Sequence, residues 1–362
     1  MKAAVVNSIS GIFDIEDIEI AEAIAREVLV EVKACGLCHS DLHFAENDFG
    51  FPTPFVVGHE VSGIVIGLGP DATEFAIGDH VVGSLVQFCG SCTSCTNGRT
   101  YQCRTPQSTA RQPGDASRLT RDGEPVFSGF SMAGFAEYVL IHENQLVKIP
   151  DEIPFAEAAL IGCSTITGAG AAINTAGVRP GDTVAVIGLG GVGLNVISGA
   201  KLAGAARIIA IDLQPAKLEL ASKFGATDVI NSGEVDAVAA VQALTDGGVD
   251  HAFEVIGLKI TSEQAIQMAR VGGGAYLIGI HKPGSSIDLD VLSLLGAQRK
   301  VQGVYMGSSN IKQDIPFYAN LFVQGRLNLS DLISKEISIH EINDAYAELK
   351  NGSIARSVIT SF

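Results

Sequence analysis

Basic residues are scarce in this chain of 362 residues. Lysine and arginine number 24 against 40 acidic residues, which gives a formal net charge of −16. A surface with this balance repels phosphate backbones and anionic lipid headgroups, so the sequence argues against nucleic acid or a membrane surface as a partner. An anion that does bind needs a local device, such as a helix N-terminus or a suitably placed arginine.

The sequence also lacks the patterns of fibrous, disordered and secreted proteins. Charged residues make up only 18% and apolar residues 47%, and the 41 glycines follow no collagen-like period. No apolar signal-peptide core precedes Asp14, Glu16 and Asp17. Two uncharged stretches, 158–178 and 183–200, are rich in Gly, Ser, Thr and Asn, which favours buried α/β core over membrane spans. We therefore expect a cytoplasmic globular protein with more than one domain.

The cysteines are irregular in number and spacing. An odd count of seven, with no signal peptide, favours metal-binding or catalytic thiols over a disulfide framework. The densest group is Cys89, Cys92, Cys95 and Cys103. Four thiolates this close can surround Zn²⁺, and such a closed site holds a lobe together. An iron–sulfur cluster is the alternative, but its usual run has three residues before the fourth cysteine, whereas seven intervene here.

A second pair of cysteines lies in the run Cys35-Gly-Leu-Cys38-His-Ser-Asp-Leu-His43. A Cys-x-x-Cys pair invites a thioredoxin-like redox interpretation. Alternatively, Cys38 alone binds a metal together with His59 and Cys163, as an open site with three protein ligands and a position for water or substrate. Sequence distance does not show that these three residues converge, and each alone fits an ordinary structural role.

A glycine-rich loop follows a strand-like run at 183–187. The loop contains four glycines, Gly188, Gly190, Gly191 and Gly193. A helical stretch at 194–203 and a second strand-like run at 207–211 come next, and Asp212 follows them. This order is the dinucleotide fingerprint, in which backbone N–H groups and a helix N-terminus approach a pyrophosphate. Asp212 can accept the ribose hydroxyls and would repel a 2′-phosphate, so NAD is favoured over NADP.

Apolar runs further along the chain continue an alternating pattern. Strands are expected at 226–230, 251–256, 275–280 and 301–306. Helices are expected around 216–223, 235–244 and 261–269. Strands that alternate with helices in this way predict a doubly wound, six-stranded parallel sheet.

Together these motifs resemble those of the NAD-linked, zinc-dependent medium-chain alcohol dehydrogenase family, which has a structural zinc lobe. The likeness runs along the whole chain and is most specific at Cys38-His-Ser-Asp, Gly58-His-Glu, the four-cysteine group, Leu160-Ile-Gly-Cys163, the glycine loop and the tail Ser353-Ile-Ala-Arg356. The resemblance implies an α/β fold in which a Rossmann domain at 166–306 interrupts a mainly β, GroES-like catalytic domain at 1–165 and 307–362. It also implies NAD and two Zn²⁺ per chain as cofactors.

The resemblance assigns roles to individual residues. Cys38, His59 and Cys163 hold the catalytic Zn²⁺, which lowers the pKa of a bound alcohol before hydride passes to the nicotinamide. The four-cysteine group holds the structural Zn²⁺. Ser40 takes the hydroxyl proton, which travels through the cofactor ribose to His43 and then to solvent.

Further residues surround these groups in the resemblance. Asp41 orients a zinc ligand, and Glu60 is the acid behind the metal, which needs a cation such as Arg356. Arg356 and His39 are also candidates for the cofactor phosphates, and Cys35 becomes a packed neighbour. Other cofactor contacts are implied for Thr167, Lys217, Val192, Ile256 and Ile280. For Val192, Ile256 and Ile280, a place in the hydrophobic core is an equally good interpretation. For Lys217, the alternative is a solvated lysine on a helix.

The expected function is reversible oxidation of a primary or secondary alcohol to an aldehyde or ketone. One alternative is a relative that oxidises the adduct of formaldehyde with a carrier thiol, which needs cations such as Arg111, Arg118 or Arg121 at the pocket. A remoter alternative is a non-catalytic NAD-binding protein. Leu85 stands where several relatives have a ring, which predicts room for bulky or aromatic alcohols. The run 301–306 resembles the edge that pairs relatives into homodimers, with a homotetramer as the alternative.

Overall fold

The computed structural model describes residues 1–352 and 356–362. The chain divides into two compact units, one made of 1–163 and 309–362 and the other of 164–308. The expected α/β fold with two units is confirmed. The chain passes between the units after residue 163 and after residue 308, each two residues from the expected boundary. No change of composition marks these positions. The residues Ser353, Ile354 and Ala355, which contributed to the family resemblance, lie outside the described residues.

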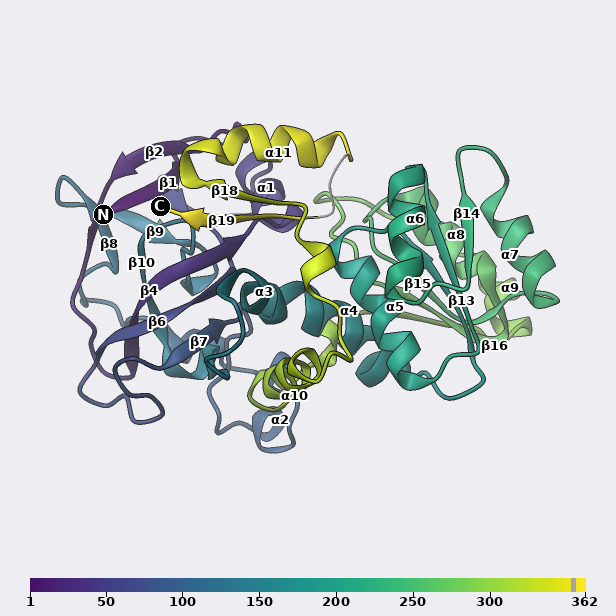
Figure 1. The fold of residues 1–362 in the computed structure, drawn as a ribbon, viewed down its shortest axis with the longest axis horizontal. Helices are drawn as coiled ribbons and strands as arrows, with labels where there is room; N and C mark the ends of the chain where they lie inside the picture. The colour runs from purple at the N-terminus through teal and green to yellow at the C-terminus, as the bar shows by residue number, and fades with distance from the viewer. Residues whose placement is uncertain (353–355) are drawn as a thin grey trace. The chain divides into compact units, whose positions relative to one another are not determined.

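The first unit is mainly β and contains two sheets (Figure 1). One sheet has the order β2-β1-β5-β9-β8-β3, with strands β1 (Lys2–Val6), β2 (Asp14–Asp17), β3 (Glu19–Ile20), β5 (Phe55–Val56), β8 (Leu119–Arg121) and β9 (Glu124–Ser128). The other has the order β11-β7-β6-β4-β19-β18, with β10 also paired to β4. Its strands are β4 (Glu27–Gly36), β6 (Glu60–Leu68), β7 (His80–Gly83), β10 (Tyr138–His142), β11 (Leu146–Lys148), β18 (Lys335–Ser338) and β19 (Ser357–Ser361). One apolar core joins these strands.

The last part of the chain completes the first unit beside its first strands. The helices of this unit are α1 (His39–Glu46), α2 (Thr93–Thr96), α3 (Phe155–Leu160), α10 (Ile311–Val323) and α11 (Ile342–Lys350). Strand β19 pairs with β4 in antiparallel register, with Ile359 opposite Cys35. Tyr346 of α11 stacks on Phe13, with ring centroids 5.1 Å apart, and its hydroxyl donates to the carbonyl of Cys38. Figure 1 shows these yellow C-terminal elements beside the purple N-terminal strands.

The second unit is built on one parallel sheet with the order β14-β13-β12-β15-β16-β17. Its strands are β12 (Thr183–Ile187), β13 (Arg207–Asp212), β14 (Asp228–Asn231), β15 (Val249–Glu254), β16 (Ala269–Leu277) and β17 (Lys300–Gly303). Its helices are α4 (Ile166–Gly170), α5 (Gly191–Ala203), α6 (Pro215–Phe224), α7 (Ala237–Thr245), α8 (Lys259–Met268) and α9 (Val291–Gly296). The order of the strands reverses between β12 and β15, and in such sheets ligands bind at the carboxyl ends of the strands beside this point.

Several element bounds differ from those expected. Helix α5 begins at Gly191 and not at 194, so it contains Gly193 of the glycine motif. Strand β16 ends at Leu277 and not at 280, and β17 ends at Gly303 and not at 306. Met306 and Gly307 both have positive φ angles, and a β-strand cannot continue through residues in that conformation.

One helical segment, Phe155–Ala176, has the length and hydropathy of a membrane span. Its most apolar window is 89% buried inside the protein, and core helices of globular proteins pass the same test. The stretch 183–200, which the sequence analysis also noted, forms β12 and most of α5 and is largely buried. Both stretches are therefore core, as expected.

We expect Phe253→Ala to destabilise the protein strongly. Phe253 is fully buried in β15 and stacks on Tyr276 at 5.1 Å between centroids, so its removal leaves a cavity that costs about 3–5 kcal/mol. Phe317→Ala is the control, because Phe317 is 47% exposed and its truncation should cost less than about 1 kcal/mol. Urea unfolding followed by circular dichroism measures both, and equal midpoint shifts would contradict the expectation.

Candidate active site

Four buried donor groups from distant stretches of the chain converge in the first unit. Cys38 precedes α1, His59 and Glu60 stand at the start of β6, and Cys163 lies in the helical turn Ile161–Thr165. One ligand atom from each of the four side chains lies within 4.8 Å of the others. His59 Nε2 is 3.2 Å from Cys163 Sγ. The structure therefore brings together the three residues whose convergence the sequence left open.

Asp41 fixes the orientation of the His59 ring. The Oδ1 atom of Asp41 lies 2.9 Å from His59 Nδ1, and it accepts the backbone N–H of Gly58 at 2.9 Å. Both side chains are completely buried. Because the carboxylate engages Nδ1, Nε2 is left to face the sulfur of Cys163, an arrangement typical of a metal-binding histidine.

The surroundings of Cys38 favour a thiolate. A hydrogen bond with Cys163 lowers the pKa of Cys38 well below its usual range, and the charges of Arg356 and His59 add to the shift against the effect of burial. The thiolate is the form of cysteine that binds metals. Two sulfurs and one imidazole nitrogen form a known ligand set for Zn²⁺ that leaves one coordination position open. The residues present therefore fit a catalytic zinc ion.

Glu60 and Arg356 form a buried ion pair beside these donors. Arg356 Nη2 lies 3.1 Å from Glu60 Oε1, and Arg356 Nη1 donates to the carbonyl of Leu37 at 2.7 Å. Burial raises the pKa of Glu60 to about 7, although the charge of Arg356 opposes the shift. Gly36 makes room for the carboxylate, because a Cβ atom there would lie 2.2 Å from Glu60 Oε2. The cation that Glu60 was expected to need is thus present.

Helix α1 carries three further predicted residues. The Ser40 hydroxyl lies 3.5 Å from Cys38 Sγ, and so adjoins the donor cluster. His43 follows at a spacing of three, which places it on the same face of the helix as Ser40. His39 is the exposed first residue of the helix. Cys35 is a buried free thiol in β4 and is outside the donor cluster.

A second group of donors occupies a separate lobe of the first unit. The sulfurs of Cys89, Cys92, Cys95 and Cys103 lie within 4.8 Å of one another, and all four cysteines are free thiols. The backbone N–H of Cys92 donates to Cys89 Sγ at 3.2 Å, and that of Cys89 donates to Cys103 Sγ at 3.2 Å. A hydrogen bond from Thr105 leads the effects that lower the pKa of Cys89 to about 5. Four sulfurs so arranged fit a structural zinc ion.

The glycine loop of the second unit lies between β12 and α5. Gly188 has a φ of +97°, which favours glycine, and Gly190 caps α5. A Cβ atom on Gly193 would lie 1.9 Å from the carbonyl oxygen of Gly188, so only glycine lets the helix start this close to the loop. Gly191 and Val192 form the first turn of α5. The free N–H groups and positive end of the helix fit a pyrophosphate.

Asp212 ties the end of β13 to this loop. Its Oδ2 atom accepts the backbone N–H of Leu189 at 2.8 Å, and Oδ1 accepts those of Leu213 and Gln214 at 2.8 and 3.0 Å. The carboxylate is half-buried and retains lone pairs for a ligand. These contacts fit an acid that binds the ribose hydroxyls beside a glycine loop.

The other predicted cofactor contacts lie around the same edge of the sheet or in the helices nearby. Ile256 and Ile280 follow β15 and β16 and are exposed, so their interpretation as hydrophobic core is wrong. The side chain of Ile256 lies beside Gly188, where an added Cβ would meet it at 2.5 Å. Thr167 in α4 donates to Met306 Sδ at 3.5 Å, and Lys217 is half-buried in α6.

Sequence reasoning missed Glu254, the last residue of β15. Its Oε1 atom accepts the N–H groups of Ile256 and Gly257 at 2.8 and 2.7 Å, and the hydroxyl of Thr261 at 2.8 Å. The side chain is fully buried and thereby orders the loop that carries Ile256. An acid that ends an apolar run is the signal that could have pointed to this role.

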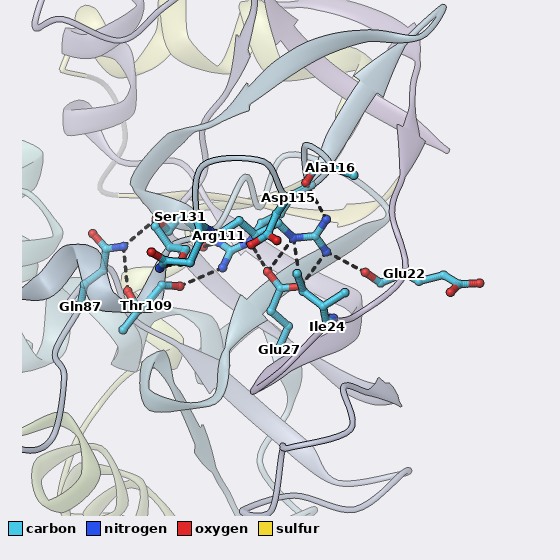
Figure 2. Close-up of polar contacts among 12 residues, drawn as sticks. Glu22, Ile24, Glu27, Gln87, Thr109, Arg111, Asp115, Ala116 and Ser131 are labelled. Carbon is cyan, nitrogen blue, oxygen red and sulfur yellow. Dashed lines mark hydrogen bonds and ion pairs between the residues drawn. The ribbon is translucent and has the colours of Figure 1, made fainter.

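The loop arginines considered as substrate contacts are engaged inside the first unit. Figure 2 shows Arg111 bound to Glu27, and Arg118 Nε also donates to Glu27, at 2.7 Å. Arg121 pairs with Glu16. Arg118 is not a solvated loop residue, because its side chain is only 7% exposed.

Known families and individual proteins match this chain along most of its length. The family model of the alcohol dehydrogenase GroES-like domain matches residues 24–151, and that of the zinc-binding dehydrogenase matches residues 191–320. The chain is 37% identical to an alcohol dehydrogenase class-3 of Drosophila melanogaster, over 99% of this chain and 97% of that protein. It is 36% identical to an S-(hydroxymethyl)glutathione dehydrogenase of Synechocystis sp., over 99% of both.

Solved structures agree over the full length of the chain. A benzyl alcohol dehydrogenase from Acinetobacter calcoaceticus matches with a TM-score of 0.93 at 34% identity, over 100% of this chain and 99% of that one. An alcohol dehydrogenase zinc-binding domain protein from Burkholderia ambifaria matches with a TM-score of 0.93 at 37% identity, over 99% of this chain and 98% of that one.

We expect serine substitutions in the two donor groups to have different effects. Cys163→Ser should lower zinc content with little change in thermal stability, because an open site serves chemistry. Cys95→Ser should lower both, because a closed four-sulfur site contributes free energy of folding. Metal analysis and thermal unfolding measure the two quantities. Cys35→Ala, at a buried cysteine outside both groups, is the matched control, and zinc content unchanged in all three variants would contradict both assignments.

Proposed function

This chain belongs to the zinc-dependent medium-chain alcohol dehydrogenase family, and on that premise we propose that it oxidises a primary or secondary alcohol to an aldehyde or ketone, reversibly, with NAD as hydride acceptor. The observation that carries the proposal is the buried set of Cys38, His59 and Cys163, which leaves a coordination position open because Glu60, the fourth donor of the cluster, is paired with Arg356. A non-catalytic NAD-binding protein has no use for an open set with the hydroxyl of Ser40 beside it.

The donors would serve two metal ions. Cys38, His59 and Cys163 would hold a catalytic Zn²⁺, and the four-cysteine lobe a structural one. When bound, the first zinc supplies a Lewis acid that lowers the pKa of an alcohol hydroxyl, and NAD supplies the hydride acceptor. Arg356 holds the Glu60 carboxylate beside the donors and offsets its charge.

The protein's own groups handle the proton. Ser40 Oγ would accept the hydroxyl proton of the alcohol while it donates its own hydroxyl proton onward toward His43, since it adjoins the donor cluster at the Cys38 sulfur. His43, on the same face of α1, passes a proton to solvent, because imidazole exchanges protons near neutral pH. Asp41 keeps Nε2 of His59 turned toward the donor cluster throughout.

We assign the second unit as the NAD-binding Rossmann domain and the first as the GroES-like catalytic domain. The start of α5 at Gly191 supports a pyrophosphate site, and Asp212 supports binding of the adenosine ribose. Exposed Ile256 and Ile280 offer apolar contacts for a nicotinamide at the carboxyl ends of the strands. Contacts of His39, Thr167 and Lys217 with the cofactor are part of the same proposal.

A second candidate function is oxidation of a formaldehyde–thiol adduct. The relative named S-(hydroxymethyl)glutathione dehydrogenase, at 36% identity, favours it. The carrier thiol of such an adduct bears carboxylates, which need cations at the site. The internal pairing of Arg111, Arg118 and Arg121 removes the three arginines that the sequence suggested for this purpose.

We also propose that the protein forms a homodimer through β17. Among the described residues this edge strand pairs only with β16. Helix α9, which precedes it, exposes Val291, Leu292 and Leu295 by 68%, 79% and 71%. An apolar patch beside a free strand edge is typical of an interface between copies of one chain. The homotetramer alternative and the cytoplasmic location stay predictions.

We expect the zinc-loaded protein to reduce NAD with free alcohols. The assay follows the absorbance of NADH with short aliphatic, benzylic and secondary alcohols, and with formaldehyde in the presence and absence of glutathione. Turnover confined to formaldehyde plus glutathione would favour the second candidate. Absence of turnover across the panel, with zinc bound, would contradict both candidates.

We expect Asp212→Asn to weaken discrimination between NAD and NADP. The change removes the charge that repels a 2′-phosphate and weakens the hydrogen bonds to the ribose, so KM for NAD should rise on the order of 10-fold while use of NADP improves. Initial rates with each cofactor measure the ratio. Glu219→Gln removes the same charge from the exposed face of α6 and is the control. An unchanged cofactor ratio in Asp212→Asn would refute the assignment.

A further inference from the structure

The ring of Phe130 lies against the metal-binding histidine. The centroids of the Phe130 and His59 rings are 5.0 Å apart, with 64° between their planes. The backbone that presents this ring is unusual, because Phe130 and Ser131 have φ angles of +55° and +57°. Residues other than glycine rarely adopt this left-handed conformation, so two in succession require support from outside the turn.

Three side chains from other segments supply that support. Arg118 Nη1 donates to the carbonyl of Ser131 at 3.1 Å, and Gln145 Nε2 donates to the carbonyl of Phe130 at 3.3 Å. Gln87 Nε2 donates to the Ser131 hydroxyl at 2.6 Å, a contact visible in Figure 2. The turn is thus held through both of its left-handed residues.

Arg118 is the most firmly anchored of the three. Its Nε donates to Glu27 Oε1 at 2.7 Å, and its Nη2 donates to the carbonyl of Thr109 at 3.1 Å. Glu27 also binds Arg111 and accepts the N–H of Ile24 (Figure 2). Burial alone would raise the pKa of Glu27, but the bonds from Arg111 and the charge of Arg118 outweigh it and hold the pKa below its ordinary value.

Phe130 joins the donor cluster to a group of aromatic rings. Its centroid lies 4.8 Å from that of Phe44 and 5.4 Å from that of Phe51, and Phe44 stacks on Phe49 at 4.4 Å. Phe44 follows Ser40 by four residues on α1, so the two share a face of the helix. The rings therefore extend from His59 to within one helical turn of the hydroxyl assigned to proton transfer, and all four are only half-buried.

We propose that Arg118 is a positioning residue which, held by Glu27, fixes Ser131 and so keeps the Phe130 ring against His59, and that this ring and its aromatic neighbours select alcohols with planar apolar groups. The second half of this inference rests on the proposed function. The geometry opposes a direct role for Arg118 in binding carboxylates of a carrier thiol, because the side chain is only 7% exposed and each of its three guanidinium nitrogens already donates to a protein oxygen.

The test compares Arg118→Met with Arg121→Met. Arg121 ends β8, three residues further on, and also pairs with a glutamate, but its side chain is 34% exposed and bonds to Asn7 and Glu16 and not to Ser131. Arg118→Met should lower kcat/KM for benzyl alcohol by on the order of 10- to 100-fold and that for ethanol much less, because the misplaced ring no longer matches the planar substrate. Arg121→Met should leave both values near those of the wild type.

A mutant cycle separates positioning from general damage. Phe130→Leu should cause a similar selective loss, and Arg118→Met combined with Phe130→Leu should lose little more than Phe130→Leu alone, since both changes remove one contact. Additive losses, or equal losses for benzyl alcohol and ethanol, would overturn the proposal. A loss confined to formaldehyde plus glutathione would overturn it too, in favour of carrier binding. If Arg118→Met does not fold, Gln87→Met removes another donor to Ser131 and takes its place.

Cobalt substitution provides a readout without turnover. In the Co²⁺-loaded protein, both donor groups would contribute visible absorption bands. The bands that Cys163→Ser removes are those of the donor cluster of Cys38, His59 and Cys163. Arg118→Met should shift these bands, because the ring beside His59 moves, whereas Arg121→Met should not. Unchanged bands in Arg118→Met would overturn the positioning role. If the wild type oxidises no alcohol, the proposed function fails, while the cobalt spectra still decide whether Arg118 positions Phe130.

Discussion

The first unit depends on how it compensates a buried concentration of negative charge. The sulfurs of Cys38 and Cys163 share a buried space with the carboxylates of Asp41 and Glu60. Charges removed from water cost several kcal/mol each unless they are paired. Asp41 is paired with His59, and Glu60 with the guanidinium of Arg356 from the last part of the chain. The pairing of β19 with β4 brings that cation to the donors, and Gly36 leaves room for the Glu60 carboxylate.

Buried carboxylates organise loops in both units. In the first, Glu27 gathers two guanidinium groups and a backbone N–H, and through them it orders the turn that presents Phe130. In the second, one oxygen of Glu254 collects two backbone N–H groups and a hydroxyl, and orders the loop that carries Ile256. Each acid satisfies several donors that would otherwise be costly to bury, so each loop has one favoured conformation.

Much of the candidate site could be predicted from the sequence, because many of the groups that act together lie close in the chain. The spacing of the four cysteines predicts a metal site and that of the glycines a dinucleotide site, because in each case the interacting groups lie close in the chain. The need of Glu60 for a cation followed from charge, once the family resemblance had placed this acid behind the metal. The partnership of Arg118 with Glu27 joins residues 91 positions apart, and nothing local marks it. The left-handed backbone of Phe130 was equally hidden, since no glycine signals it. The start of α5 inside the glycine motif reflects a close approach of backbone that overrides helix propensity.

The interrupted layout of the chain has a consequence for biosynthesis. The ribosome delivers β4 and Cys38 long before β19, and the whole of the second unit emerges between them. The continuous stretch 164–308 can complete its own core during translation, as domains generally do. The first unit still lacks β18, β19 and the Arg356 cation until the segment after residue 308 is made. The donor cluster of Cys38, His59 and Cys163 therefore lacks its compensating cation while the second unit is being made.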